Sequence, residues 1–276
     1  MTFDPGDRQN GVSVIIPTHD RNEKLKRAIR SVISQTYRNF EIIVIDDTGS
    51  ASEVTMEFPD IRYIFIHPTR YPAEARNAGI EASRREYIAF LDDDDCWYPD
   101  KLCRQVTVLK NYSKIGLVCG NGMAGDCPYL SREIKNEIDM LHQEILGDFV
   151  VTSSTMIRAS LLKETGLYFV DASLPVGEDY DFSIRFAAVS GVWYDPIPLF
   201  EYTVSQDSIQ NRGGGSFTEY HRGVLRVMIR IGWFLERNHL MDPTSRLLIW
   251  YRGMVAIVSI LYNGVKDSIR SVISSV

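Results

Sequence analysis

The sequence predicts an α/β protein built on a doubly wound, mostly parallel sheet flanked by helices. Short runs of aliphatic and β-branched residues alternate with segments of helical periodicity over about the first 110 residues. The short runs are apolar without interruption, which is typical of strands covered on both faces. Strands that alternate with helices in this way form parallel sheets with helices on both sides.

The first half of the chain shows these elements in regular order. The apolar run VSVIIP predicts a strand at residues 12–17, which ends at a proline. A helix should follow, because apolar residues recur at helical spacing at Leu25, Ala28, Ile29, Val32 and Ile33. Further strands are predicted at residues 40–45, 61–66 and 86–91, and further helices at 73–83 and 101–109.

The second half is less regular. Strands are predicted at residues 115–119 and 149–157 and a helix at 179–189, whereas residues 121–140 match no pattern. Gly213 to Gly215 indicate a hinge or loop. A helical tail follows, with an apolar stripe at Val224, Val227, Met228, Ile231 and Leu235 and an arginine row at Arg222, Arg226 and Arg230. We therefore divide the chain into residues 1–110, 111–215 and a tail at 216–276.

Charge narrows the functional classes. The net charge of −6 argues against a general nucleic-acid binder, which would show a basic excess. The tail carries 8 Lys and Arg against 4 Asp and Glu, so the tail is +4 and the remaining residues are −10. This uneven charge indicates that the tail contacts a different surface from the remaining residues.

The cysteines and the ends of the chain bear on its location. The four cysteines form no C-x-x-C pair, so we expect reduced thiols in a cytoplasmic protein. The first ten residues are polar and have no apolar h-region, so we expect no signal peptide. The longest apolar stretch, Leu247 to Tyr262, is interrupted by Arg252 and is shorter than the ~20 residues of a spanning helix. We expect a soluble protein whose tail either packs on the core or contacts the inner face of the cell membrane.

Four consecutive aspartates, Asp92 to Asp95, follow directly on the strand predicted at residues 86–91. At a buried strand end they would be costly unless a cation neutralised them. Manganese and magnesium suit such ligands, and they complete their shells with water and phosphate oxygens. The alternative is a solvated acidic loop before the helix that begins after Pro99. Because residues 17–21 and 46–47 also lie at strand ends, all three groups should meet in one crevice.

Two further acidic pairs are candidates, each with an ordinary alternative. Asp46 and Asp47 could accept hydrogen bonds from a base or a ribose, or they could cap the next helix. Glu178 and Asp179 precede a helix, where a carboxylate could act as a general base for an acceptor hydroxyl. Acids are equally favoured there by the helix dipole.

Four basic residues could bind a base or phosphate: His19, Arg21, Arg70 and Arg76. Residues of these types are more often surface ion pairs. Arg76 is the strongest of the four, because it begins a helix that leads to the aspartate strand.

Five motifs stand in a fixed order at residues 12–21, 34–47, 75–80, 86–102 and 177–186, from VSVIIPTHDR to GEDYDFSIRF. In this order they resemble the family 2 glycosyltransferases of the GT-A fold, over about residues 11–205. The resemblance implies an inverting, metal-dependent enzyme that uses a nucleotide-diphosphate sugar, with a UDP-sugar favoured. It implies a carbohydrate or lipid-linked acceptor, and a role in cell-surface polysaccharide, glycolipid or glycoprotein glycan synthesis.

The resemblance also assigns roles to residues. The nucleotide-sugar site would comprise Pro17, Thr18, His19, Arg21, Asp46, Asp47, Arg76, Asp92 and Asp93. Asp47 is the better match of its pair for the base. Asp94 would bind the metal, Mn²⁺ or Mg²⁺, and Asp95 would support the turn that follows. Asp179 matches the catalytic base, with Glu178 as its neighbour.

The sequence departs from the family pattern in three places. His19-Asp20 replaces the usual Tyr-Asn, which leaves the base less certain. No histidine occurs in residues 202–206, near the end of the catalytic region. Residues 121–147, where acceptor specificity would lie, match no motif.

Two other functions are alternatives to sugar transfer. A nucleotidyltransferase would need a Gly-rich triphosphate loop after the first strand, and would leave Glu178 and Asp179 unexplained. A non-catalytic nucleotide-sugar-binding protein would not be expected to keep both Asp94 and Asp179.

Overall fold

The structure of the protein is a computed structural model that describes residues 9–68, 72–130, 134, 140–147, 149–168, 177–203 and 217–274. Predictions that concern Arg70, residues 204–206 and residues 213–215 fall outside this range.

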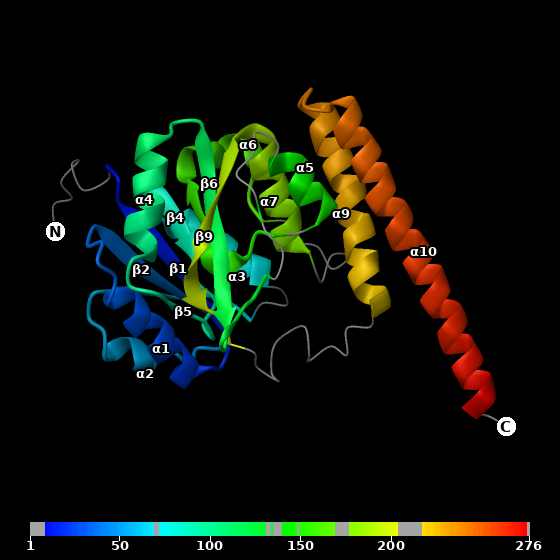
Figure 1. Cartoon of the computed structure of the whole chain (residues 1–276). Helices are drawn as coiled ribbons and strands as arrows, with labels where there is room; N and C mark the ends of the chain where they lie inside the picture. The colour runs from blue at the N-terminus through cyan, green and yellow to red at the C-terminus, as the bar shows by residue number, and fades with distance from the viewer. Residues whose placement is uncertain are drawn as a thin grey trace.

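One sheet forms the centre of the described chain (Figure 1). Its strand order is β3-β2-β1-β4-β8-β6-β9-β5, and β7 pairs with β6. The strands are β1 Val12–Thr18, β2 Phe40–Asp46, β3 Ile61–Phe65, β4 Tyr87–Phe90, β5 Cys96–Trp97, β6 Ile115–Ala124, β7 Cys127–Pro128, β8 Met156–Arg158 and β9 Gly191–Glu201. The larger helices are α1 Asn22–Ile33, α2 Ser52–Met56, α3 Pro72–Ala82, α4 Lys101–Asn111, α5 Met140–Leu146, α6 Leu162–Thr165, α7 Glu178–Val189, α9 Phe217–Arg237 and α10 Pro243–Ser274.

The first half of the sheet is parallel, as predicted. β1 pairs in parallel with both β2 and β4, and Val12 lies level with Phe40 on one side and Tyr87 on the other. Because the three strands start level, their carboxyl ends reach the same edge. Thr18 is therefore level with Asp46, and the four aspartates leave β4 beside them.

The second half of the sheet is mixed. β8 is antiparallel to β4 and β6, while β9 is parallel to β6. The strand predicted at residues 149–157 is wrong: Thr152–Ser154 form a 3₁₀ turn and only Met156–Arg158 form a strand. β9 was not predicted, because Pro196 and Pro198 interrupt its apolar pattern.

Helices cover both faces of the sheet, which explains the uninterrupted apolar runs of the strands. Alternate residues of β1 enter different cores: Val14 packs with α1 and α4, and Ile15 packs with α3 and α7. Every residue of β1 except Pro17 is buried. The α/β fold class predicted from the sequence is confirmed.

The tail helices pack on the rest of the described chain through α5 and α7. The apolar stripe of α9 joins Tyr180 and Ile184 of α7 in a third core, which also includes Ala256 of α10. Figure 1 shows α9 lying between α7 and α10, with α10 outermost. The arginine row is not uniformly solvated, because Arg230 Nε lies 3.1 Å from Oδ1 of the buried Asp181.

α10 is longer than the apolar stretch predicted for this region. Its residues Pro243–Tyr262 make a 20-residue segment that is long and apolar enough to cross a membrane by length and composition. The expectation that this region is too short to do so is therefore wrong, since the helix begins before Leu247. Only 17% of the most apolar window is buried inside the protein.

Two helical glycines should respond in opposite directions to replacement by alanine. A Cβ at Gly79 in α3 would lie 2.4 Å from Ile15 Cγ2 in the core, so Gly79→Ala should destabilise the protein by about 1–3 kcal/mol. At Gly232 in α9 a Cβ would meet nothing within 4 Å. Gly232→Ala should stabilise by about 0.5–1 kcal/mol, because glycine loses more backbone entropy in a helix. Urea denaturation of both variants checks the pair. Equal effects at the two positions would contradict the close packing of α3 on β1.

Candidate active site

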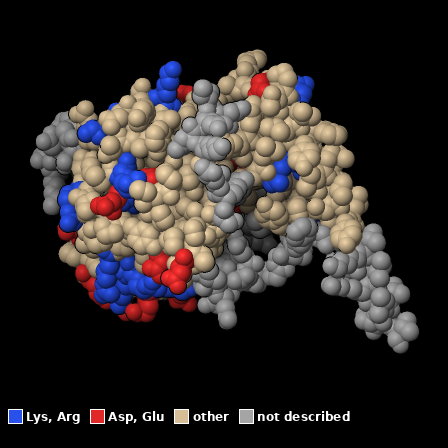
Figure 2. All heavy atoms as spheres, in the orientation of Figure 1, with Lys and Arg blue, Asp and Glu red and all other residues tan. Residues whose placement is uncertain are grey.

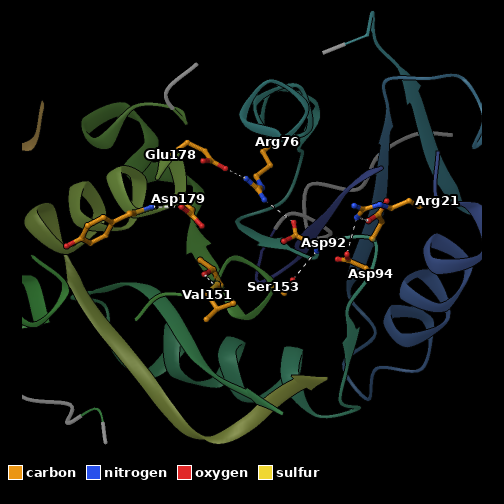
Figure 3. A network of polar contacts seen from close by, with 11 residues as sticks. Arg21, Arg76, Asp92, Asp94, Val151, Ser153, Glu178 and Asp179 are labelled. Carbon is orange, nitrogen blue, oxygen red and sulfur yellow. Dashed lines mark hydrogen bonds and ion pairs between the residues drawn. The ribbon is translucent and has the colours of Figure 1, made fainter. Parts of the chain in front are cut away.

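The candidate site lies where the carboxyl ends of β1 and β4 meet the first turns of α3 and α7. Figure 3 shows Arg21 with Asp94 on one side, Glu178 and Asp179 on the other, and Arg76 with Asp92 between them. The predicted convergence of residues 17–21 with the aspartates is therefore present in the structure, and Glu178 and Asp179 join the same group.

Arg21 and Thr18 fix the middle of the aspartate run. Asp93 accepts a hydrogen bond from Thr18 Oγ1 at 2.8 Å and one from Arg21 Nη1 at 3.0 Å. The same Arg21 nitrogen lies 3.0 Å from Asp94 Oδ2. Burial raises the pKa of Asp93 to about 6, although Arg21 and Thr18 oppose the shift. Asp93 thus ties the end of β1 to the aspartate loop.

Arg76 joins the aspartate loop to α7. Its Nη2 lies 3.0 Å from Asp92 Oδ1, and its Nη1 lies 2.9 Å from Glu178 Oε1. The arginine side chain is 7% exposed, so both ion pairs are largely shielded from water. Burial and the neighbouring Asp179 raise the pKa of Glu178 to about 7, and Arg76 only partly opposes the shift. The guanidinium therefore holds two carboxylates, from segments 86 residues apart in sequence, in one crevice.

Asp179 occupies the first turn of α7. The helix starts after Gly177, whose φ of +98° lies in the left-handed region that favours glycine. Asp179 Oδ1 accepts the backbone N–H of Tyr180 at 2.9 Å. This contact orients the carboxylate at the end of the helix, beside Glu178 (Figure 3).

Asp46 and Asp47, at the end of β2, lie in different environments. Asp46 is fully buried and accepts hydrogen bonds from the Thr48 N–H, the Thr48 hydroxyl, the Ala51 N–H and the Tyr63 hydroxyl, at 2.8–2.9 Å. Burial opposes ionisation, but these bonds hold the pKa of Asp46 below its usual range. Asp47 Oδ1 lies 2.7 Å from Nδ1 of the exposed His19. Asp46 thus shapes the loop after β2, while the buried Asp47 meets the exposed ring of His19.

Three residues that no sequence motif marked also build the site. Ser153 Oγ accepts the backbone N–H of Asp92 at 3.1 Å, from the 3₁₀ turn before β8. The backbone N–H of Thr203 donates to Asp95 Oδ1 at 2.9 Å, just after β9. Tyr202 packs against Tyr129 with ring centroids 4.3 Å apart. These contacts join segments that are distant in sequence, so no local pattern could reveal them.

Asp95 differs from the other aspartates. Burial, followed by the charge of Asp92, raises the pKa of Asp95 to about 8. Its contact with Thr203 anchors the aspartate loop to the end of β9. This supporting position is compatible with the role that the sequence suggested for it.

The chemistry of the aspartate loop fits a divalent cation. The side chains of Asp92 and Asp94 are 35% and 15% exposed, so both remain accessible. Burial and the negative charge of Asp92 raise the pKa of Asp94, which a bound cation would reverse. Within the described residues, no group of three or more His, Cys, Asp or Glu side chains could hold a metal by itself. Such a loop suits Mg²⁺ or Mn²⁺, which accept one or two carboxylates when phosphate oxygens complete the shell.

Comparison with solved structures identifies the fold. S. aureus TarS 1–349, solved with UDP-GlcNAc, aligns with a TM-score of 0.62 at 17% identity, over 79% of this chain and 66% of TarS. A mannosyltransferase from Pyrobaculum calidifontis, solved with GDP-Man and Mn²⁺, aligns with a TM-score of 0.63 at 13% identity, over 92% of this chain and 75% of that chain. The fold is that of the GT-A glycosyltransferases.

The chain belongs to glycosyl transferase family 2, whose family model matches residues 13–166. An uncharacterized glycosyltransferase of Rickettsia typhi is 28% identical over 221 residues, which cover 76% of this chain and 69% of that protein. The Escherichia coli UDP-Glc:alpha-D-GlcNAc-diphosphoundecaprenol beta-1,3-glucosyltransferase WfgD is 33% identical over 124 residues, which cover 41% of this chain and 49% of WfgD. The chain thus spans about half of WfgD and 40% of the longer TarS structure. The resemblance inferred from the five motifs is confirmed.

Glu178 should make stability depend on pH. Its folded-state pKa of about 7 is above its ordinary value of 4.5, so its contribution to stability is present below pH 4.5 and is lost as the pH rises through 7. Gln cannot ionise, so the stability of Glu178→Gln relative to the wild type should rise between about pH 5 and about pH 8. Urea denaturation across this range measures the difference. Glu23→Gln, at a side chain that is 88% exposed, is the control and should give a flat difference. If the stability difference between Glu178→Gln and the wild type does not change with pH, burial does not raise the pKa of Glu178.

Proposed function

We propose that the protein is an inverting, metal-dependent glycosyltransferase that moves a sugar from a nucleotide-diphosphate donor to a hydroxyl acceptor. The observation that supports this most is the double ion pair of Arg76. It holds Asp92 of the acidic loop and Glu178 of α7 within 3.0 Å of one guanidinium. A candidate base, Asp179, therefore stands at the same crevice as the donor-side acids.

The donor would lie along the carboxyl ends of the strands. Asp47 and His19, paired at 2.7 Å, suit the base end of a nucleotide, where a carboxylate can accept an N–H and an imidazole can stack. Thr18 and Asp93, which are hydrogen-bonded at 2.8 Å, would lie next to the ribose. Asp94, with Asp92 beside it, would hold the metal and the diphosphate. When bound, a divalent ion supplies positive charge against the negative charge that develops on the departing diphosphate.

Asp179 suits the role of general base. A carboxylate within hydrogen-bond reach of an acceptor hydroxyl can remove its proton while the oxygen attacks the anomeric carbon. In a single displacement the leaving diphosphate departs from the opposite face, so the sugar inverts and no nucleophilic side chain is required. The N–H of Tyr180 orients the Asp179 carboxylate, and Glu178 is kept from this role by Arg76.

The donor we favour is a UDP-sugar, because TarS was solved with UDP-GlcNAc and the name of WfgD specifies UDP-Glc. The GDP-Man in the mannosyltransferase structure keeps GDP-sugars in the test. The acceptor would be a carbohydrate or a lipid-linked sugar, as the name of WfgD specifies for that enzyme. The reaction would take place at the inner face of the cell membrane, in surface polysaccharide or glycoconjugate synthesis, with residues 217–276 in peripheral contact with the membrane.

Donor binding should require both metal and Asp94. A UDP-sugar with Mn²⁺ should raise the thermal midpoint in a dose-dependent way, because a ligand at about 100 times its Kd stabilises by about 2.7 kcal/mol. Asp94→Asn should lose this shift, since an amide is a weaker ligand than a carboxylate. Asp60→Asn, at an exposed turn before β3, is the matched control and should keep it. Thermal shift against UDP, GDP, dTDP and CMP sugars measures the effect. If none of them shifts the wild type in the presence of metal, the donor-site assignment fails.

Asp179→Asn should separate binding from chemistry. The variant should retain the metal-dependent donor shift but lose transfer by about 10²–10⁴-fold, the usual contribution of a general base. Transfer of labelled sugar to a panel of carbohydrate and lipid-diphosphate acceptors provides the measurement. Retained transfer would remove Asp179 from its role. Donor binding without transfer by the wild type to any acceptor would favour a non-catalytic nucleotide-sugar-binding protein instead.

A further inference from the structure

One face of α10 is apolar and exposed. We call it the outer face of α10 and define it by six side chains, each between 53% and 68% exposed: Leu247, Trp250, Tyr251, Val258, Leu261 and Tyr262. At 3.6 residues per turn these positions fall within a stripe of about 120°. Soluble proteins rarely expose large contiguous apolar patches unless the patch binds a partner.

The opposite face of α10 is already packed. Ser245, Gly253 and Ala256 are buried, and Ala256 lies in the core that α9 shares with α7. The helix is therefore apolar on two sides, and no described residue covers the outer one. In Figure 1, α10 is the outermost element, with α9 between it and the sheet. In Figure 2, this flank of the molecule is mostly free of charged side chains, which gather instead on the part that holds the sheet.

The composition of the outer face favours a lipid surface over another protein. Trp250, Tyr251 and Tyr262 combine an apolar ring with a polar edge, as do the aromatic residues that gather at the membrane interface. The tail is +4 while the remainder is −10, so the tail suits an anionic surface that would repel the rest. A symmetric dimer through this face would instead place one basic tail against another.

The packing of α10 also determines how it would meet the membrane. A spanning orientation would carry the buried Gly253 and Ala256 into the bilayer, and with them α9. The stripe of α9 is bound in turn to Tyr180 and Ile184 of α7. An in-plane orientation keeps these contacts and places only the outer face among the lipid chains.

We propose that the outer face of α10 binds an anionic lipid surface, with the helix lying in the plane of the membrane and the catalytic domain above it. The inference concerns a surface remote from the acidic loop. It holds whether or not the site transfers sugar, so its test needs neither donor nor metal.

Vesicle flotation of the full-length protein tests the proposal. The wild type should float with phosphatidylcholine vesicles that contain phosphatidylglycerol, and less with phosphatidylcholine alone. Trp250→Glu and Leu261→Glu should each lower the partition coefficient onto the vesicles by about tenfold or more, the contribution of one large apolar side chain. Met56→Glu is the control, because Met56 is 80% exposed on α2, and it should float like the wild type. Circular dichroism melts verify that the variants are folded.

Three outcomes would overturn the proposal. The first is that the wild type does not float, or that both α10 variants float as well as the wild type. The second is a dimer in analytical ultracentrifugation that Trp250→Glu dissociates, without flotation, which would assign the face to a second copy. The third is protection of a C-terminal tag from protease added outside the vesicles, which would show that α10 spans the bilayer.

Discussion

The geometry of the site depends on one buried cation. Arg76 lies near the start of α3, and its guanidinium is 3.0 Å from Asp92 and 2.9 Å from Glu178. A cation that is 7% exposed is stable only with its anions in place, and loss of one member of such a group typically costs about 3–5 kcal/mol. The arginine therefore fixes the first turn of α7 against the aspartate loop. It also holds Glu178 in an ion pair, which in the proposed mechanism leaves Asp179 as the base.

The sheet brings these groups into range before Arg76 joins them. β1 lies between β2 and β4 with its start level with both, so the polar segments after the strands emerge at one edge. Beyond β4 the pairing turns antiparallel, and this change places the Thr152–Ser154 turn under the loop. Ser153 then accepts the Asp92 N–H, while Thr203 at the end of β9 holds Asp95. Both halves of the sheet thus contribute contacts that keep four adjacent carboxylates in a defined arrangement.

The sequence predicted well those elements whose structure can be read from their own residues, without knowledge of their neighbours in the fold. β1 and β2 are covered on both faces, so their apolar runs identify them without knowledge of their neighbours. β9 could not be found in this way, since Pro196 and Pro198 are accommodated where its pairing with β6 is interrupted, between Asp195 and Phe200. The site shows the same contrast. The aspartate loop carries a strong local signal, but the different environments of Asp46 and Asp47 depend in part on Tyr63 and His19, which are distant in sequence.

The tail is not a separate attachment, because α9 contacts α7, the helix that carries Asp179. Asp181 is buried two residues after Asp179 and pairs with Arg185 on its own helix at 2.6 Å and with Arg230 of α9 at 3.1 Å. Removal of the tail would take away Arg230 and also uncover Tyr180 and Ile184. A truncated chain would therefore lose stability at the helix that carries Asp179, whatever the tail binds. Substitutions on the outer face of α10 test binding without this loss of stability, because none of its six side chains belongs to the core shared by α7 and α9. The turn that carries Asp179 and the proposed lipid contact thus belong to one stack of helices, in which α9 lies between α7 and α10.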